Sequence, residues 1–80
     1  MTNLEKYKEA FVVGLDIPVE QVKEGLIYES VDNWDSVGHM AMIAEIEYAF
    51  NILMKTDDIL EFDSFEKGIE ILKKYDVVIC

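Results

Sequence analysis

The sequence predicts an all-α domain built as a four-helix bundle, with a long loop between the first two helices and a short third helix. Two observations support this prediction. Apolar residues recur at the helical period in several segments, and patterns typical of helix starts stand ahead of these segments. With 80 residues, of which 51% are hydrophobic, the chain has the size of a single domain, which we expect to cover residues 1–80.

The first predicted helix covers residues 3–15. Thr2 and Glu5 have the spacing of a capping box, in which two side chains satisfy backbone N–H groups at the helix start. Pro18 disfavours helical structure in the residue before it, so the helix ends ahead of it. The apolar stripe of this helix consists of Leu4, Tyr7, Phe11 and Leu15.

Residues 16–35 form the connection to the second helix. A loop of this length is uncommon in a compact domain. We interpret it as the path that the chain needs if the first two helices run parallel and the loop travels the length of the bundle. A helical turn after the proline would direct Val19 and Val22 inward.

The second predicted helix covers residues 36–50 and carries apolar side chains on two opposite sides. The inner side consists of Met42, Ile43, Ile46, Ala49 and Phe50, and the outer side of Val37, Met40, Ala41, Ala44, Glu47 and Tyr48. Because the outer side of a bundle helix normally carries charge, we interpret it here as a surface that docks partner proteins. The alternative is a central helix with both sides buried.

Two shorter helices complete the predicted bundle. The third is expected over residues 57–61, with Thr56 as its cap. The fourth is expected over residues 64–75, and the segment from Asp63 to Glu66 has a capping-box pattern. Its inner stripe consists of Phe65, Ile69 and Leu72.

The net charge of −10 is unevenly distributed along the chain. Between Glu29 and Glu66 there are ten acidic residues and one lysine, and the chain contains no arginine. Such a chain repels nucleic acid and anionic membrane surfaces and is steered towards basic patches on proteins. The alternative is that the charge serves solubility alone.

The sequence favours a cytoplasmic setting. No apolar run approaches the length of a membrane span, and the first residues lack the basic start and apolar core of a signal peptide. The single cysteine, Cys80, cannot form an internal disulfide, which agrees with a reducing compartment, and we expect it to be a tail residue.

The stretch 33–40 joins the loop to the second helix and presents a serine at the helix start. As the N-cap, Asp35 would accept a hydrogen bond from the backbone N–H of Val37 or Gly38. Ser36 then occupies the first helical position, exposed and close to unpaired N–H groups. A phosphate esterified to this hydroxyl would lie in the positive field of the helix end, which favours it by roughly 0.3–1 kcal/mol.

The motif Trp34-Asp35-Ser36-Val37 at a helix start, in an acidic chain of this size and helix order, resembles that of the acyl carrier proteins. The resemblance covers nearly the whole chain and implies the bundle of that family. It implies that Ser36 carries covalent 4′-phosphopantetheine, with Asp35 as the neighbouring contact, and that the thiol of this group holds an acyl or aminoacyl cargo. The implied partners are a phosphopantetheinyl transferase, a loading enzyme and downstream acyl-processing enzymes. The implied carrier is a monomer without a catalytic residue or a metal.

Departures from the family pattern bear on the pathway. Many carriers have an acidic residue where Gly38 stands, and carriers of fatty acid synthesis have several along the outer side of the second helix. Here Ala41 and Tyr48 stand at such positions, and Glu47 is the main charge. These departures from the family pattern therefore favour a specialised pathway, such as natural product or surface polysaccharide synthesis. The alternative is a carrier of fatty acid synthesis.

Other functions stay open at this point. An unmodified acidic adaptor would dock one partner through the second helix. A hydrolase would use Ser36 with His39, although no orienting carboxylate or oxyanion site accompanies this pair. The acidic residues between Asp57 and Glu66 lack the alternating ligands and central glycine of a calcium loop, so we expect them to serve capping and solvation.

Overall fold

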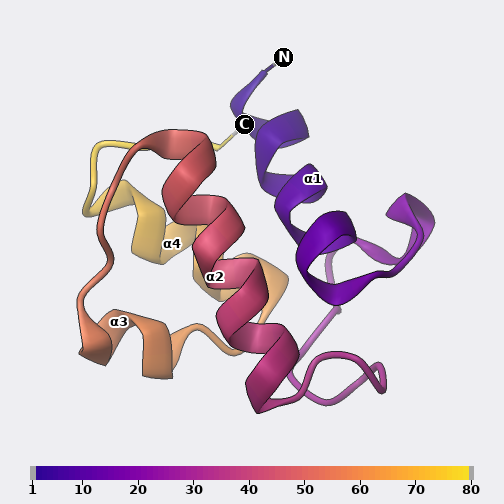
Figure 1. Cartoon of the computed structure of the whole chain (residues 1–80). Coiled ribbons are helices and arrows are strands. Elements are labelled where there is room, and N and C mark those ends of the chain that lie inside the picture. The colour runs from indigo at the N-terminus through magenta and orange to yellow at the C-terminus, as the bar shows by residue number, and fades with distance from the viewer. Residues whose placement is uncertain (1, 80) are drawn as a thin grey trace.

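The computed structural model describes residues 2–79 and shows an all-helical chain (Figure 1). Its α-helices are α1 at Asn3–Leu15, α2 at Ser36–Phe50, α3 at Thr56–Glu61 and α4 at Phe65–Lys73, and a 3-10 helix, η1, lies at Val19–Gln21. Within residues 2–79 there is no β-strand, and the Cα radius of gyration is 11.1 Å. The predicted all-α class and helical bundle are therefore confirmed.

The ends of the first two long helices follow from local signals in the sequence. At α1 the Glu5 backbone N–H donates to the Thr2 hydroxyl (3.1 Å) and the Thr2 N–H donates to the Glu5 carboxylate (2.8 Å), which is the predicted capping box. Asp16 and Asn51, which follow α1 and α2, both have left-handed backbone with φ of 54°. That conformation ends a helix, and α1 and α2 coincide with the predicted ranges.

The starts of the last two helices differ from the prediction by one residue. Thr56 does not cap α3, because Lys55 occupies the cap position in an extended conformation and its N–H donates to the Tyr75 hydroxyl. Ser64 caps α4 by accepting from the Lys67 N–H (2.9 Å). Ser64 is itself extended and pairs with the loop in an isolated β-bridge. The α4 helix therefore begins after Ser64, and it ends at Lys73, short of the predicted 75.

α1 and α2 pack side by side and run in opposite directions (Figure 1). The Lys6 ammonium lies 5.9 Å from the centre of the Phe50 ring, so the start of α1 is beside the end of α2. Gly14, near the end of α1, lies against the backbone of Met42, and a Cβ there would be 2.6 Å from the Met42 nitrogen. The prediction of parallel helices is therefore wrong.

The loop between α1 and α2 is long because it forms one end of the core. It returns to the end of α1, where the Asn33 side-chain amide donates to the Asp16 carbonyl oxygen (3.4 Å). Val22 is buried as predicted, whereas Val19 is 52% exposed because η1 turns it outward. The buried side chains that the loop contributes are Ile17, Val22, Leu26 and Trp34.

The centre of the core is aromatic. Phe11 lies between Tyr7 and Trp34, with ring centroids 5.0 and 5.5 Å away and near-perpendicular planes. The Tyr7 hydroxyl donates to the Phe65 carbonyl oxygen at the start of α4 (2.6 Å). On α4, Phe65 and Leu72 are buried as predicted; Ile69 is partly buried, and Ile71 is buried without having been predicted.

The segment after α4 packs on the bundle. Val77 and Ile79 are buried, and the Asn3 side-chain amide donates to the Val78 carbonyl oxygen (3.0 Å), which ties this segment to the start of α1. The prediction for Cys80 falls outside the described residues. Across residues 2–79, no helix is both long enough and apolar enough to span a membrane.

Candidate functional site

The loop that leads into α2 is anchored by Trp34. Its side chain is fully buried, 5.5 Å from the Phe11 ring and 6.2 Å from the Tyr28 ring between centroids. The Trp34 indole N–H donates to Nδ1 of His39 (2.9 Å), so the polar end of this buried side chain is also paired. The residues that follow, which form the helix start, are therefore held in a fixed position.

Asp35 is the N-cap of α2, as predicted. Its carboxylate accepts a hydrogen bond from the Gly38 N–H (2.8 Å), and its carbonyl oxygen accepts one from the His39 N–H (2.8 Å). Ser36 is the first residue of α2 and is exposed. Since the first N–H groups of a helix have no acceptor within the helix, a negatively charged group on the Ser36 hydroxyl would lie beside free donors.

Gly38 allows the loop to approach the first turn of α2. A Cβ at this position would overlap the Asn33 carbonyl oxygen and would lie 3.1 Å from its carbon and 3.2 Å from Cδ2 of Leu15. The glycine therefore does not leave open space beside Ser36; that space is occupied by the backbone of Asn33. An acidic side chain could not take this position without moving the loop.

His39 lies one turn after Ser36, and its ring is fully engaged. Nδ1 accepts from the Trp34 indole, so the ring proton must be on Nε2, which donates to the Ile59 carbonyl oxygen (2.8 Å). The planes of the Trp34 and His39 rings are nearly parallel (16°), with centroids 6.2 Å apart, and the two rings meet at their edges through this hydrogen bond. In this arrangement no ring nitrogen is available to accept a proton from Ser36, which argues against a Ser36–His39 nucleophile pair.

A pocket of about 260 Å³ lies next to Ser36, between α2 and α3. It is lined by Tyr28, Ser36, His39, Met40, Ile59, Leu60, Phe62 and Asp63. The lining residues that were not identified as site residues from the sequence are Tyr28, Ile59, Leu60, Phe62 and Asp63. They come from the loop before α2, from α3 and from the segment between α3 and α4, and no local pattern connects them with Ser36. Of these residues, Leu60 is 77% exposed on a short helix, an exposure that only the structure reveals.

The two sides of α2 have the predicted difference in burial. On the inner side Met42, Ile43 and Ile46 are at most 1% exposed. On the outer side Val37 is 78% and Tyr48 88% exposed, which contradicts the alternative of a central helix with both sides buried. The remaining outer residues that are exposed are Met40, Ala41 and Ala44.

Glu47 differs from the other residues of the outer side. It is only partly exposed, and its carboxylate accepts a hydrogen bond from the Met54 N–H (2.9 Å) in the segment between α2 and α3. This bond holds the connecting segment against the last turns of α2. Glu47, the main charge predicted for the docking surface, therefore also has a structural role.

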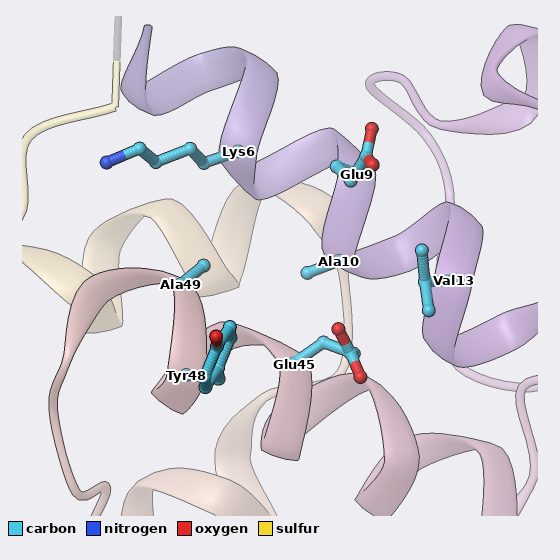
Figure 2. A pocket seen from close by; sticks show the side chains of 7 residues that line it. All are labelled: Lys6, Glu9, Ala10, Val13, Glu45, Tyr48 and Ala49. Carbon is cyan, nitrogen blue, oxygen red and sulfur yellow. The ribbon is translucent and has the colours of Figure 1, made fainter. Parts of the chain in front are cut away.

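A second groove, of about 250 Å³, lies between α1 and α2 on the part of α2 remote from Ser36 (Figure 2). Its lining residues are Lys6, Glu9, Ala10, Val13, Glu45, Tyr48 and Ala49. The small side chains of Ala10 and Ala49 leave the space between the two helices, with Glu9 on α1 and Glu45 on α2 beside it. Ser36 does not line this groove, so the groove is not part of the candidate site.

Asp58 of α3 has a structural role. Asp58 is buried, its carboxylate accepts hydrogen bonds from the Lys74 ammonium (2.6 Å) and the Tyr75 hydroxyl, and these bonds lower the pKa of the carboxyl group. The bond to Asp58 likewise raises the pKa of Lys74. Among residues 2–79, no three His, Cys, Asp or Glu side chains are grouped so that they could hold a metal ion.

Comparison of the chain with protein-family models, with curated proteins and with solved structures finds no match. The function must therefore be inferred from the candidate site itself. Its parts are an exposed serine at a capped helix start, an apolar pocket beside that serine, and an exposed apolar side of the same helix.

Proposed function

We propose that this chain is an acyl carrier protein, which carries an acyl or aminoacyl group as a thioester on a 4′-phosphopantetheine arm attached to Ser36. The observation that carries the proposal is the position of Ser36, exposed at the first residue of α2 directly after the Asp35 cap. The resemblance of the surrounding motif to that of the carrier proteins, together with the acidic charge, agrees with this position.

The proposed modification requires little from the carrier itself. A phosphopantetheinyl transferase would direct the Ser36 hydroxyl oxygen at the β-phosphorus of coenzyme A. A new P–O bond forms, the bond between the two phosphates breaks, 3′,5′-ADP leaves, and the hydroxyl proton passes to the transferase. The phosphodiester that results is an anion at a helix start, where the helix field stabilises it by roughly 0.3–1 kcal/mol.

The pocket beside Ser36 supports the proposal and bears on the cargo. An arm on Ser36 begins at the rim of an apolar pocket of about 260 Å³, next to Met40 and Leu60. The inner volume of the bundle is filled by aromatic rings, including Phe11, Phe62 and Phe65. A short acyl group therefore suits this protein better than a long chain.

The outer side of α2 is the proposed docking surface. A small apolar surface on an acidic chain favours brief binding to enzymes that present basic side chains around an apolar centre. Tethering then raises the effective concentration of the cargo at whichever enzyme has docked. The low number of acids on this side supports a specialised pathway, such as natural product or surface polysaccharide synthesis, with fatty acid synthesis as the alternative.

The test is the intact mass of the protein after incubation with coenzyme A, magnesium and a broad-specificity phosphopantetheinyl transferase. We expect the mass to increase by one phosphopantetheine unit. The gain should be absent in Ser36→Ala and retained in the matched control Ser30→Ala, which removes another exposed serine. No gain with several transferases on folded protein, or a gain that persists in Ser36→Ala, would refute the proposal.

The second candidate is an unmodified acidic adaptor that binds one stable partner through the outer side of α2. The observation that favours it is the exposure of large apolar side chains there, with Tyr48 at 88% and Val37 at 78%. The adaptor predicts that Ser36→Ala retains function and that Tyr48→Ala loses it. The carrier predicts complete loss of function in Ser36→Ala.

A further inference from the structure

The α3 helix has little intrinsic stability. It is six residues long, far below the length at which a helix is stable by itself, and no side chain caps its start. Two sets of side-chain hydrogen bonds attach it to the bundle. On one side, Asp58 binds Lys74 and Tyr75 after α4. On the other, Nε2 of His39 donates to the Ile59 carbonyl oxygen near the end of α3.

The bond from His39 satisfies a backbone group that a helix end leaves unpaired. Ile59 is three residues before the helix cap, and its carbonyl oxygen has only a long backbone bond of 3.4 Å from the Phe62 N–H. The His39 bond is shorter (2.8 Å) and comes from α2, so it sets the distance between the two helices. Ile59, His39 and Ser36 all line the same pocket.

The ring that makes this bond is itself fixed by its surroundings. The buried Trp34 indole lies edge to edge with the His39 ring, in a nearly parallel plane, and donates to Nδ1, which keeps the proton on Nε2. The rings of Tyr28 and Phe62 approach it edge-on, at 5.9 and 6.0 Å between centroids. Asp63 is the carboxylate that shares the pocket lining with His39.

We infer that His39 is a positioning residue. Trp34 holds its ring in place, the ring in turn holds α3 through its bond to Ile59, and this sets the width of the pocket beside Ser36. Its neutral, Nε2-protonated ring is required, because a proton on Nδ1 would face the Trp34 N–H. The consequence for a cargo in this pocket rests on the proposed function. The positioning of α3 by His39 does not rest on the proposed function, and it is tested on the unmodified protein.

Two substitutions separate the two ring nitrogens. In His39→Gln the side-chain amide reaches the place of Nε2 and can donate to Ile59, whereas in His39→Asn the amide oxygen takes the place of Nδ1 and can accept only from Trp34. We expect amide hydrogen exchange in α3, measured relative to α4, to be about 3- to 10-fold faster in His39→Asn. In His39→Gln it should stay within twofold of the wild type.

Equal exchange in α3 for His39→Asn and the wild type, or greater loosening in His39→Gln, would overturn the inference. Should His39→Asn not fold, the nitrogen chemical shifts of His39 in the wild type decide. At pH 7.5 they should show a neutral ring with its proton on Nε2, and a proton on Nδ1 would overturn the inference.

The cargo is tested separately. After loading with a butanoyl group, the thioester should react faster with hydroxylamine in His39→Asn than in His39→Gln, and equal rates would refute the link to the pocket. A failure to load Ser36 at all would refute the carrier function and leave the exchange result on α3 intact.

Discussion

A single methyl group at Gly38 tests how the loop fixes the helix start that carries Ser36. In Gly38→Ala the new Cβ overlaps the Asn33 carbonyl oxygen, and it lies 3.1 Å from the carbonyl carbon, closer than ordinary contact. Such overpacking costs about 1–3 kcal/mol. Because Asn33 must move, the Asp35 cap is disturbed as well, at a cost of about 1 kcal/mol. The higher helix propensity of alanine offsets about 1 kcal/mol of these costs.

The net expectation for Gly38→Ala is a destabilisation of about 2 kcal/mol, which lowers the melting temperature of a domain of this size by roughly 8–16 °C. The fluorescence of Trp34, the single tryptophan of the chain, reports the unfolding in urea or with temperature. Val37→Ala is the matched control, because Val37 is the neighbouring residue and is 78% exposed. It should change the stability by less than about 0.5 kcal/mol. A melting temperature of Gly38→Ala equal to or above that of the wild type would refute the reasoning.

Two further predictions concern the bonds that hold α3 and α4. The pKa of Asp58 is lowered by its bonds to Lys74 and Tyr75, so the stabilisation is present above the ordinary carboxyl pKa of 3.8 and is lost as pH falls through the lowered value. The urea midpoint of the wild type, measured between pH 7 and pH 2, should therefore fall at the acid end of this range. The midpoint of Asp58→Asn should fall less steeply, and equal pH dependence in the two proteins would contradict this reasoning. Tyr7→Phe removes the buried bond to the Phe65 carbonyl oxygen (2.6 Å) and should cost about 1–2 kcal/mol of unfolding free energy, measured by thermal melting; an unchanged melting temperature would show that this bond contributes nothing.

The local part of the candidate site could be predicted from the sequence. An aspartate ahead of an apolar helical segment is sufficient to predict a cap, and the structure has Asp35 in that role with Ser36 as the first helical residue. The two sides of α2 followed from the helical period in the same way. Capping and periodicity depend on residues within one or two turns of each other, so a sequence contains them directly.

The direction of the helices and the packing of the loop were decided by the tertiary structure. The sequence indicated parallel helices as the reason for a long loop, whereas α1 and α2 are antiparallel and the loop fills one end of the core with side chains such as Trp34. Loop length alone does not distinguish a segment that spans the bundle from one that packs into it. That choice depends on which distant apolar surfaces the buried loop residues can cover.

The neighbours of Ser36 were also decided by the tertiary structure. The bonds from Trp34 to His39 and from His39 to Ile59 join residues that are 5 and 20 positions apart, in a loop, in α2 and in α3. No periodic pattern records such contacts, because each partner only becomes near when the helices have packed. The sequence by itself determined where the serine stands on its helix, and the packing of the bundle determined what surrounds it.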